Sequence, residues 1–471
     1  MDVVRNTNAY AGQRGLFSDS CGHTSLVELK KFLGLLIRLG VCPTHDVKSW
    51  WSSPESSFCF GDERPQHVMT GQRFDQLRTM LHLSPPGDTS DKFGNVLTSF
   101  RDNCEGLWVL GETLSIDELT IGCGDRSAHM TRIKYKREGD GYQFDAVCER
   151  EYTFSFWPRW TPPPASIVGV APTFARMLWL IERTGGKWHR IYCDNLYISA
   201  AVLRRALDRK TLVAGTCREG GRGFPAIADQ AVAKGVTAIA AAKNTVKAAV
   251  STDSALLAVS VYDSKPVRLM STIHTTAALL DKTRQVWDAT TKKRVPLTYK
   301  RLNIVDDYNH GMNSVDLADK ARMLYRPDTY LRFKKWWWSI FVWVIGTAAT
   351  NAYVLYAAQC RKAGKEPCEH KMFRSRLAEQ LCGIQQEASG VAPAAAGGVR
   401  KRARRVDADW CEKFTGRTEG SHVLHVMQDS RTDCQLCKAE TGRCVKAKLS
   451  CRTCEVNFCL GMCWETWHTK V

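Results

Sequence analysis

The sequence lacks an apolar segment near its N-terminus. Its opening residues, MDVVRNTNAYAGQRG, contain no apolar run of the kind that a secretory signal peptide needs. We therefore expect the 19 cysteines to be reduced thiols or metal ligands rather than disulfides. Seven of the cysteines fall between Cys434 and Cys463, and the others are scattered along the chain. The C-terminal cluster is therefore the candidate metal site.

Acidic residues are scarce relative to basic ones. The chain has 48 Asp and Glu against 66 Lys and Arg, a formal net charge of +18 at pH 7. A surface with such an excess attracts polyanions, of which nucleic acid is the commonest inside cells. The composition is otherwise that of a soluble globular protein, with 44% hydrophobic and 24% charged residues. A chain of 471 residues is long enough for about two to four domains.

Charged residues are also missing between Trp336 and Cys360, a run long enough to span a membrane. We nevertheless predict a buried helix of a soluble protein, because the larger residues recur at helical spacing. The run also contains polar residues: Ser339, Thr347, Thr350, Asn351 and Gln359. We therefore expect no membrane association.

Hydrophobic periodicity predicts two kinds of structure along the chain. Residues 25–85 have the spacing of amphipathic helices. Beyond them, short strand-like runs alternate with helical ones. The predicted strands are 114–121, a hairpin at 141–157, 187–194 and 211–217, and the predicted helices are 177–186, 199–210 and 311–325. This alternation predicts an α/β fold with parallel strand pairing. A further strand pair is expected within a β-rich insertion.

Four aspartates occupy positions that could bind metal. Asp117 interrupts the apolar strand LSIDEL, and Asp194 ends the strand RIYCD. Asp316 and Asp319 lie three residues apart and so share one helix face. Taken singly, Asp117 could equally be an exposed edge residue, Asp194 a helix N-cap and Asp316 a first-turn residue. Together they have the ligand chemistry of a two-metal phosphoryl-transfer site, because Mg²⁺ prefers oxygen ligands.

Several segments, in their order along the chain, resemble the piggyBac transposase family. They are SIDEL, YCDNLYISAAVLRRALDRKTLVAGTCREGGRGFP, VYDSKPVRLMSTIH, DDYNHGMNSVDLADK and KKWWWSIFVWVIGTAATNAYVLY. The resemblance implies an RNase H-like core in which Asp117, Asp194 and Asp316 are the catalytic ligands of Mg²⁺ or Mn²⁺, with Asp319 as an accessory acid. It also implies hydrolytic nicking and strand transfer of DNA ends at TTAA targets.

The chain departs from the family pattern at three places. Asn313-Ser314 stand where the family usually has two glycines before the third aspartate. The segment IKYKREGDGYQF lacks the family's proline, and the acidic N-terminal region of many members is missing. A domesticated, non-catalytic protein that binds DNA or chromatin is therefore the alternative function.

The same resemblance implies double-stranded DNA as the partner, a homodimer and a nuclear location. The residues expected to contact DNA are basic: Lys134, Lys136, Arg137, Arg218 and Arg222. The basic run VRKRARR could be a nuclear-import signal or simply a solvated charge run. The tryptophans at 336–338 could stack on bases, but core packing is favoured because the adjoining helix is apolar.

The C-terminal cysteines have the spacing of zinc ligands. The cluster consists of Cys434, Cys437, Cys451, Cys454, Cys459, Cys463 and His468. Paired Cys-x2-Cys motifs bring two thiolates onto one Zn²⁺, and His422, His425 or Cys444 could complete a second site. The resemblance implies a two-zinc, cross-brace domain that binds DNA ends. A RING-type module and a histone-reading finger have similar spacing.

These observations predict a domain order. A helical dimerisation and DNA-binding region occupies 20–110 and 326–385, and the catalytic core occupies 111–217 and 301–325. The insertion occupies 218–300. A linker that contains the basic run occupies 386–420, and the cysteine-rich zinc domain occupies 421–471.

Overall fold

The chain forms two compact units, Met1–Glu387 and Ala388–Val471. In the first, the computed structural model describes residues 2–17, 22–42, 47–52, 65–88, 92–93, 95–123, 127–132, 140–232, 244–327, 331 and 335–384. In the second it describes 424–426, 433–434, 437, 447, 449–451 and 456–458.

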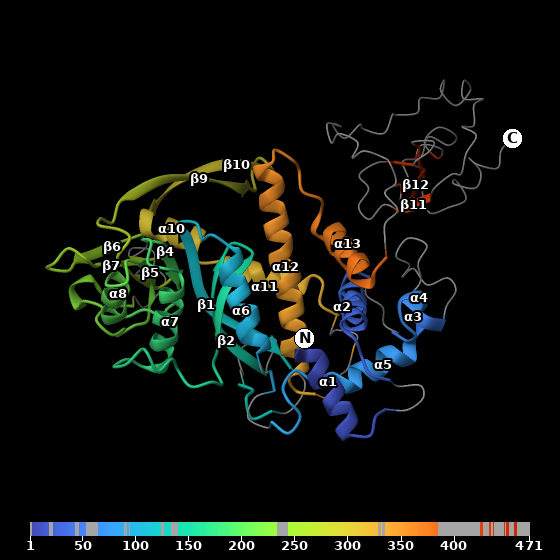
Figure 1. Ribbon diagram of the computed structural model, residues 1–471. Helices are drawn as coiled ribbons and strands as arrows, with labels where there is room; N and C mark the ends of the chain where they lie inside the picture. Colours follow the sequence, from blue (N-terminus) through green and yellow to red (C-terminus); the bar gives the residue numbers. More distant parts are fainter. Residues whose placement is uncertain are drawn as a thin grey trace. The chain divides into compact units, whose positions relative to one another are not determined.

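Helices form the N-terminal part of the first unit (Figure 1). They are α1 (Asp2–Gln13), α2 (Leu26–Val41), α3 (Ser49–Ser52), α4 (Pro65–Val68), α5 (Gly71–Met80) and α6 (Val96–Leu107). The predicted helices α2 and α5 are confirmed. Both begin at a side-chain cap, because the Ser25 hydroxyl accepts from the Glu28 amide and Thr70 from the Arg73 amide, at 3.1 and 3.2 Å. Periodicity did not predict α1.

An eight-stranded sheet with the order β3-β2-β1-β4-β5-β8-β7-β6 is the centre of this unit. Its first five strands are β1 (Thr113–Gly122), β2 (Gly141–Glu149), β3 (Tyr152–Pro158), β4 (Arg190–Cys193) and β5 (Leu212–Cys217). The sheet is completed by β6 (Val246–Val250), β7 (Leu257–Tyr262) and β8 (Pro266–Ser271). β4 is parallel to both β1 and β5, which confirms the predicted parallel pairing.

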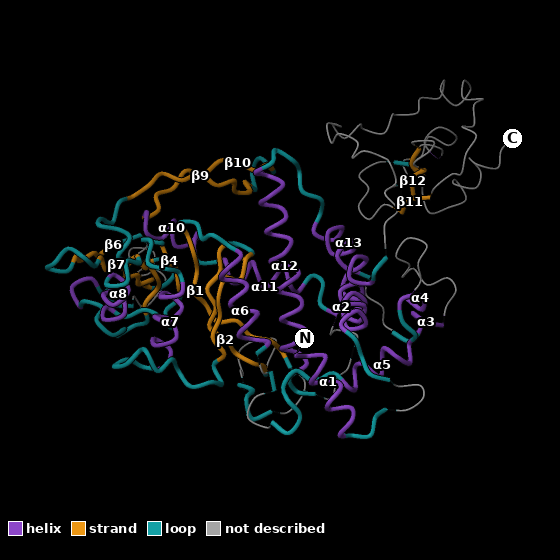
Figure 2. The backbone as a smooth tube through the Cα atoms, in the orientation of Figure 1, coloured by secondary structure: helices purple, strands orange, loops and turns teal. Residues whose placement is uncertain are grey.

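Strands from the predicted insertion extend this sheet. β8 pairs antiparallel with β5, through Ala214 opposite Ser271, and β7 and β6 follow outward. The predicted boundary after residue 217 therefore lies within a continuous sheet. Only β9 (Leu279–Asp288) and β10 (Lys293–Leu302) form a separate two-stranded ribbon. In Figure 2 this ribbon runs as a long orange pair away from the main sheet.

Helices cover both faces of the sheet. On one face lie α7 (Pro172–Arg183) and α8 (Ala200–Leu207), which form a core with Leu114 and Ile116 of β1. On the other lie α11 (Ser314–Met323) and α12 (Trp338–Lys362), which form a core with Leu119 and Ile121. Successive side chains of a strand point to opposite faces. Asp117 is therefore on the α11 face, and Glu118 is on the α7 face.

The uncharged run forms the helix α12, as predicted. In the described part of the chain, α12 is the one helix long and apolar enough to cross a membrane, and 61% of its most apolar window is buried within the protein. Trp338, Ile340 and Trp343 are almost fully buried in the core that α12 shares with the sheet. Burial in this core explains the apolar character of the helix.

The second helix of this unit, α2, and its last one meet closely. α13 (His370–Cys382) packs against α2, and a side chain at Gly34 would collide with the Cys382 thiol and the Ala378 carbonyl. The remaining elements are the short η1 (Ala226–Ala228) and the helix α10 (Asn303–Gly311), which was not predicted. In the second unit, β11 (Leu424–Val426), β12 (Leu449–Cys451) and β13 (Val456–Phe458) form a small antiparallel sheet.

Candidate active site

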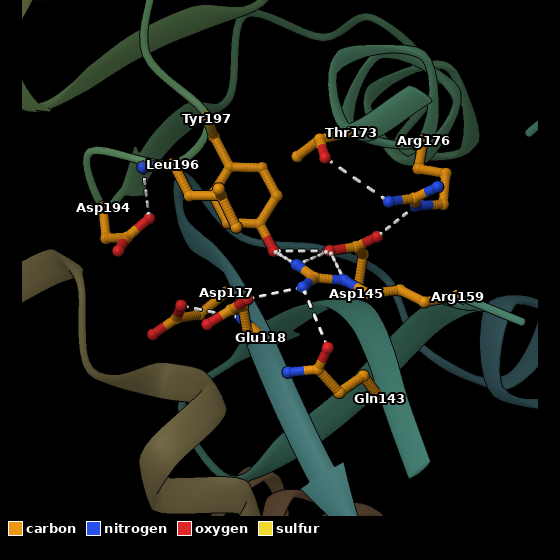
Figure 3. A network of polar contacts seen from close by, with 10 residues as sticks. All are labelled: Asp117, Glu118, Gln143, Asp145, Arg159, Thr173, Arg176, Asp194, Leu196 and Tyr197. Carbon is orange, nitrogen blue, oxygen red and sulfur yellow. Dashed lines mark hydrogen bonds and ion pairs between the residues drawn. The ribbon is translucent and has the colours of Figure 1, made fainter. Parts of the chain in front are cut away.

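The register of two parallel strands brings Asp117 and Asp194 together. Ile116 of β1 lies beside Cys193 of β4, so the next residue on each strand is an aspartate at the same level. β4 ends there, and Asp194 begins a turn in which its carboxylate accepts from the Leu196 amide at 2.8 Å. Asp117 accepts from the Glu118 amide at 2.7 Å. Figure 3 shows both carboxylates on the same side of β1.

A serine two residues before Asp117 places the third aspartate. The Ser115 hydroxyl accepts from the Val315 amide at 3.1 Å, a bond between residues 200 positions apart. Val315 lies in the first turn of α11, where amides have no partner within the helix. Asn313 occupies the expected N-cap position but makes no side-chain cap bond. Ser115 therefore caps α11 in its place, and Asp316 follows in the same turn, beside β1.

The charges of Asp194 and Asp316 act on the carboxyl group of Asp117. Burial, and then the negative charges of Asp194 and Asp316, raise the pKa of Asp117 to about 7. Burial also raises the pKa of Asp194, against a bond from the Leu196 amide that lowers it. Asp316 is exposed. Within the described residues, no Lys, Arg or His forms an ion pair with any of the three. Among the described side chains, the three carboxylates therefore have no directly contacting cation.

Its donor chemistry suits a divalent cation. Three carboxylates, two of them half-buried, offer the oxygen ligands that Mg²⁺ and Mn²⁺ prefer. Among the described residues, however, no three His, Cys, Asp or Glu side chains are gathered closely enough to hold one ion. The three aspartates thus lie in the same region of the protein, but their carboxylates are not close enough together to bind one ion.

A buried polar network lies on the opposite face of β1 (Figure 3). Asp145, which is fully buried, accepts from Arg159 at 2.5 Å, from Arg176 at 2.5 Å and from the Tyr197 hydroxyl at 2.6 Å. Arg159 also donates to Glu118 at 2.5 Å. Because Tyr197 lies three residues after Asp194, this network fixes the turn that presents the Asp194 carboxylate.

Sequence reasoning missed this network. Asp145 was predicted only as one member of an alternating hairpin, and Arg176 immediately precedes the predicted helix 177–186. A usable signal was present, because a charge inside the run YQFDAVC could be buried only with a partner. The sequence does not indicate which arginine would supply it.

Tyr308 and Arg218 flank the aspartates. Burial raises the pKa of Tyr308 to about 12, with smaller contributions from the charges of Asp194 and Asp117. Its helix, α10, packs tightly against β4, since a side chain at Gly311 would overlap the ring of Tyr192. The exposed Arg218 donates to Asn195 at 2.6 Å, and its charge lowers the pKa of Asp194.

The other predicted residues have different surroundings. Asp319 is bonded to Arg322 at 2.5 Å, so it is already neutralised on its own helix. Arg222 is exposed near the start of α8, where its carbonyl accepts from the Ala200 amide at 3.2 Å. Lys134, Lys136 and Arg137 lie outside the described residues.

The predicted zinc ligands are only partly described. The Cys437 amide donates to the Cys434 sulfur at 3.5 Å, so the first Cys-x2-Cys pair forms one tight turn. Cys451 ends β12, opposite Leu424 of β11. His425 belongs to β11. Cys444, Cys454, Cys459, Cys463, His422 and His468 lie outside the described residues.

Comparisons with known proteins agree with this architecture. A family model described as Transposase IS4 matches residues 2–353. The structure is also similar to piggyBac transposase, solved as a synaptic complex with hairpin DNA, with a TM-score of 0.64 and 20% sequence identity. That match covers 97% of this chain and 91% of the piggyBac chain. The family match spans most of the chain, and the structural match shows a shared fold.

Proposed function

Because the chain belongs to the Transposase IS4 family and has the fold of piggyBac transposase, we propose that it is a metal-dependent DNA transposase with an RNase H-like catalytic core. The observation that carries the proposal is the placement of Asp117 beside Asp194 at the ends of two parallel strands, with the first turn of α11, which carries Asp316, bonded to Ser115. These residues are far apart in the sequence. The pKa of Asp117 is raised by burial and by the charges of Asp194 and Asp316, and such shifts are a feature of functional sites.

In the proposed reaction, Asp117, Asp194 and Asp316 would hold Mg²⁺ or Mn²⁺. Bound divalent ions would supply activation of the attacking oxygen and stabilisation of the leaving oxygen. The surrounding residues keep the carboxylates in place: Ser115 anchors α11 through the Val315 amide, and the Leu196 amide orients Asp194. Water would attack the phosphorus, and the P–O3′ bond would break to give a 3′-hydroxyl and a 5′-phosphate. The 3′-hydroxyl would then attack a target phosphodiester, at TTAA by the family resemblance, and would join the target 5′-phosphate as a target 3′-hydroxyl leaves.

The ribbon β9–β10 supplies a surface for duplex DNA. Residues 279–302 contain seven Lys and Arg and two Asp, a net charge of +5, and most of their side chains are exposed. Arg284 and Arg301 lie over the Tyr299 ring, at 5.2 and 5.3 Å. A two-stranded ribbon has the width to enter the major groove. Lysines and arginines along it would contact phosphates.

We also propose a zinc domain in the second unit, a nuclear location and a homodimer. A Cys-x2-Cys turn of the kind that Cys434 and Cys437 form suits Zn²⁺, and we assign residues 421–471 to a zinc domain with two ions. The basic run at 399–405 supports a nuclear location, and assembly as a homodimer follows from the family resemblance.

The proposal can be tested by nicking of duplex DNA that carries the terminal repeats flanking the gene. Full-length wild type should nick these ends in Mg²⁺, and Asp194→Asn should not. Asp263→Asn is a matched control, because Asp263 is an exposed aspartate at the β7–β8 turn of the same sheet. If wild type binds these ends but never cuts them, the domesticated, non-catalytic function replaces the proposal.

A further inference from the structure

A pocket of about 530 Å³ opens at the edge of the sheet, beside the last residues of β3. This size lies within the usual range for small-molecule sites. Its walls are largely aromatic: Phe93, Phe156, Trp157, Trp160 and Trp336. None of these residues belongs to the aspartate site or to its supporting network.

The three consecutive tryptophans at the start of α12 divide between two environments. Trp337 and Trp338 are buried in the core, with 3% and 2% of their surfaces exposed. Trp336 is half-buried and lines the pocket. Its ring is held by Phe93 at 5.8 Å and by Tyr142 at 5.8 Å. Core packing thus explains two of the tryptophans, while the third has a face available to a ligand.

Trp160, which also lines the pocket, is fixed in the same way. Trp160 meets Phe144 edge to face at 4.9 Å and Tyr142 at 5.8 Å. It is half-buried. Rings that are held by their neighbours lose little freedom when a flat ligand stacks on them, which favours binding. The pocket is therefore suited to a planar, unsaturated group.

Charge narrows the choice of ligand. The lining includes Lys92, Arg101 and His129, and none of the described lining residues is acidic. Such a lining disfavours a cation, including the methylated lysines that aromatic cages bind. Two buried donors in the lining, Arg101 Nε and Trp157 Nε1, have no hydrogen-bond partner among the described residues. Arg101 Nε does lie 3.7 Å from the exposed Asp102 carboxylate.

The aromatic rings suit a planar group, the two donors suit acceptor atoms, and the basic side chains suit a negative charge. A nucleotide combines a planar base, acceptor atoms and a charged phosphate. We propose that this pocket binds an unstacked nucleobase of a DNA strand, with the base stacked against the aromatic lining and its phosphate near Lys92 and Arg101. The inference rests on the proposed function for its source of DNA. Aromatic stacking of this kind is a common means of holding single-stranded nucleic acid.

The location agrees with a role beside the reaction site. Pro158 pairs with Phe144, and Phe144 pairs with Leu119 of β1, two residues beyond Asp117. Two strand spacings and two residue rises separate the backbone at Pro158 from that at Asp117 by about 12 Å. This is the length of roughly three to four nucleotides of a duplex strand. A base held there would be a few positions from the bond that is cut.

The test measures binding of the full-length protein to a short fluorescein-labelled single strand and to the corresponding duplex, at one salt concentration. Trp160→Leu should weaken single-strand binding about tenfold, as expected for the loss of one stacked base, and should change duplex binding less than about twofold. Trp160→Phe should retain most of the affinity, because a ring remains. Trp108→Leu removes a half-buried tryptophan outside the pocket and should change neither affinity.

A second variant tests the pocket independently, in case Trp160→Leu fails to fold. Thr98→Trp fills the pocket from an exposed position on α6 without removing any core side chain, and it should give the same selective loss. Equal losses for both DNA forms, or no loss, would overturn the inference and leave the proposed function intact. Competition by free dAMP as effective as by the single strand would identify a nucleotide site instead. Wild type that binds neither DNA form would overturn the proposed function as well.

Discussion

Asp316 and Asp319 lie one turn apart on α11, but their surroundings differ. Asp319 is bonded to Arg322 at 2.5 and 3.1 Å, whereas Asp316 is exposed and its charge raises the pKa of Asp117. The sequence motif makes both residues candidates for metal binding. Because Asp319 is engaged by Arg322, we propose Asp316 as the third ligand.

We expect Asp316→Ala to reduce nicking more than about 100-fold, beyond the loss typical of altering an outer-shell partner of a metal ligand. Folding should change little, because the residue loses only its interaction with the helix dipole, about 1 kcal/mol at most. Nicking in Mg²⁺ and thermal melting measure the two effects. Asp319→Ala is the paired control and should keep substantial activity. Equal cutting by Asp316→Ala and wild type would remove Asp316 from the site.

The raised pKa of Asp117 predicts a pH effect in the metal-free protein. The folded carboxyl has a pKa of about 7 against an ordinary 3.8, so between these values the folded state binds more protons than the unfolded state. The free energy of unfolding must then fall as pH rises through this window, by up to about 1.4 kcal/mol per pH unit. Asp117→Asn should lack this loss and be more stable than wild type at pH 8.

Urea unfolding at pH 5 and pH 8, in chelator, measures the effect. The difference between wild type and Asp117→Asn should grow with pH, while Asp263→Asn should follow wild type. Parallel stability curves for wild type and Asp117→Asn would mean that the carboxylate is not destabilised by its surroundings.

Sequence reasoning made the aspartates candidates because each ends or interrupts an apolar strand or opens a helix, and because the segments around them resemble the piggyBac transposase family. It could not locate Asp145 with Arg159 and Arg176, because those partners lie 14 and 31 residues from Asp145 along the chain. Nothing in their neighbouring residues indicates that they meet.

At the scale of elements, one hydroxyl joins a strand to a helix. Ser115→Ala would leave the buried Val315 amide without its acceptor, at a cost on the order of 1 kcal/mol, and would loosen α11 against β1. We expect the Mg²⁺ concentration for half-maximal nicking to rise several-fold. Ser115→Thr keeps the hydroxyl and should restore the wild-type value.

Ser260→Ala is the matched control for this change. Ser260 is a buried serine on β7 of the same sheet, and its hydroxyl has no partner among the described residues. Its replacement should leave the Mg²⁺ dependence unchanged. A purely structural role of Ser115 would instead lower stability and leave that dependence as it was.

The ribbon β9–β10 should contribute to duplex binding through charge. Replacing Lys293, Arg294 and Lys300 by glutamine should reduce the slope of log affinity against log salt by about 0.9 for each phosphate that is no longer neutralised. All three are exposed, so the fold should be unaffected. Binding titrations at several salt concentrations measure the slope.

Three exposed basic residues outside the ribbon provide the comparison. Arg150, Lys187 and Lys210 lie near the turns that precede the parallel strands or join β2 to β3. Their replacement by glutamine removes the same charge and should change the slope much less. An equal change in both variants would assign the salt dependence to overall charge rather than to the ribbon.

Most elements followed from periodicity, and the exceptions have physical causes. α6 and α10 were not foreseen because their apolar residues are few and are completed by tertiary contacts. The continuation of the sheet into β8, β7 and β6 was not foreseen either. Strand propensity predicts that a segment is extended, but it does not predict with which strand the segment pairs, because pairing depends on packing between distant parts of the chain.

At the scale of the whole molecule, the C-terminal unit should depend on zinc. A domain this small has little apolar core, so metal binding would supply its folding free energy. In the full chain, a zinc chelator should sharply raise hydrogen exchange in peptides from 421–471. Peptides from 141–217, in the sheet, should exchange as before. Unchanged protection of the C-terminal peptides in chelator would rule out the zinc domain.

The bond between Ser115 and Val315 has a consequence for the newly made chain. All eight strands of the sheet are complete by Ser271, whereas Asp316 follows Asp194 by 122 residues. At typical synthesis rates this interval is roughly 6–24 s. During that time the chain already holds the first two aspartates but not the third. A product that ends prematurely before α11 could keep the sheet, yet it would carry an incomplete set of ligands and be unable to cut the DNA.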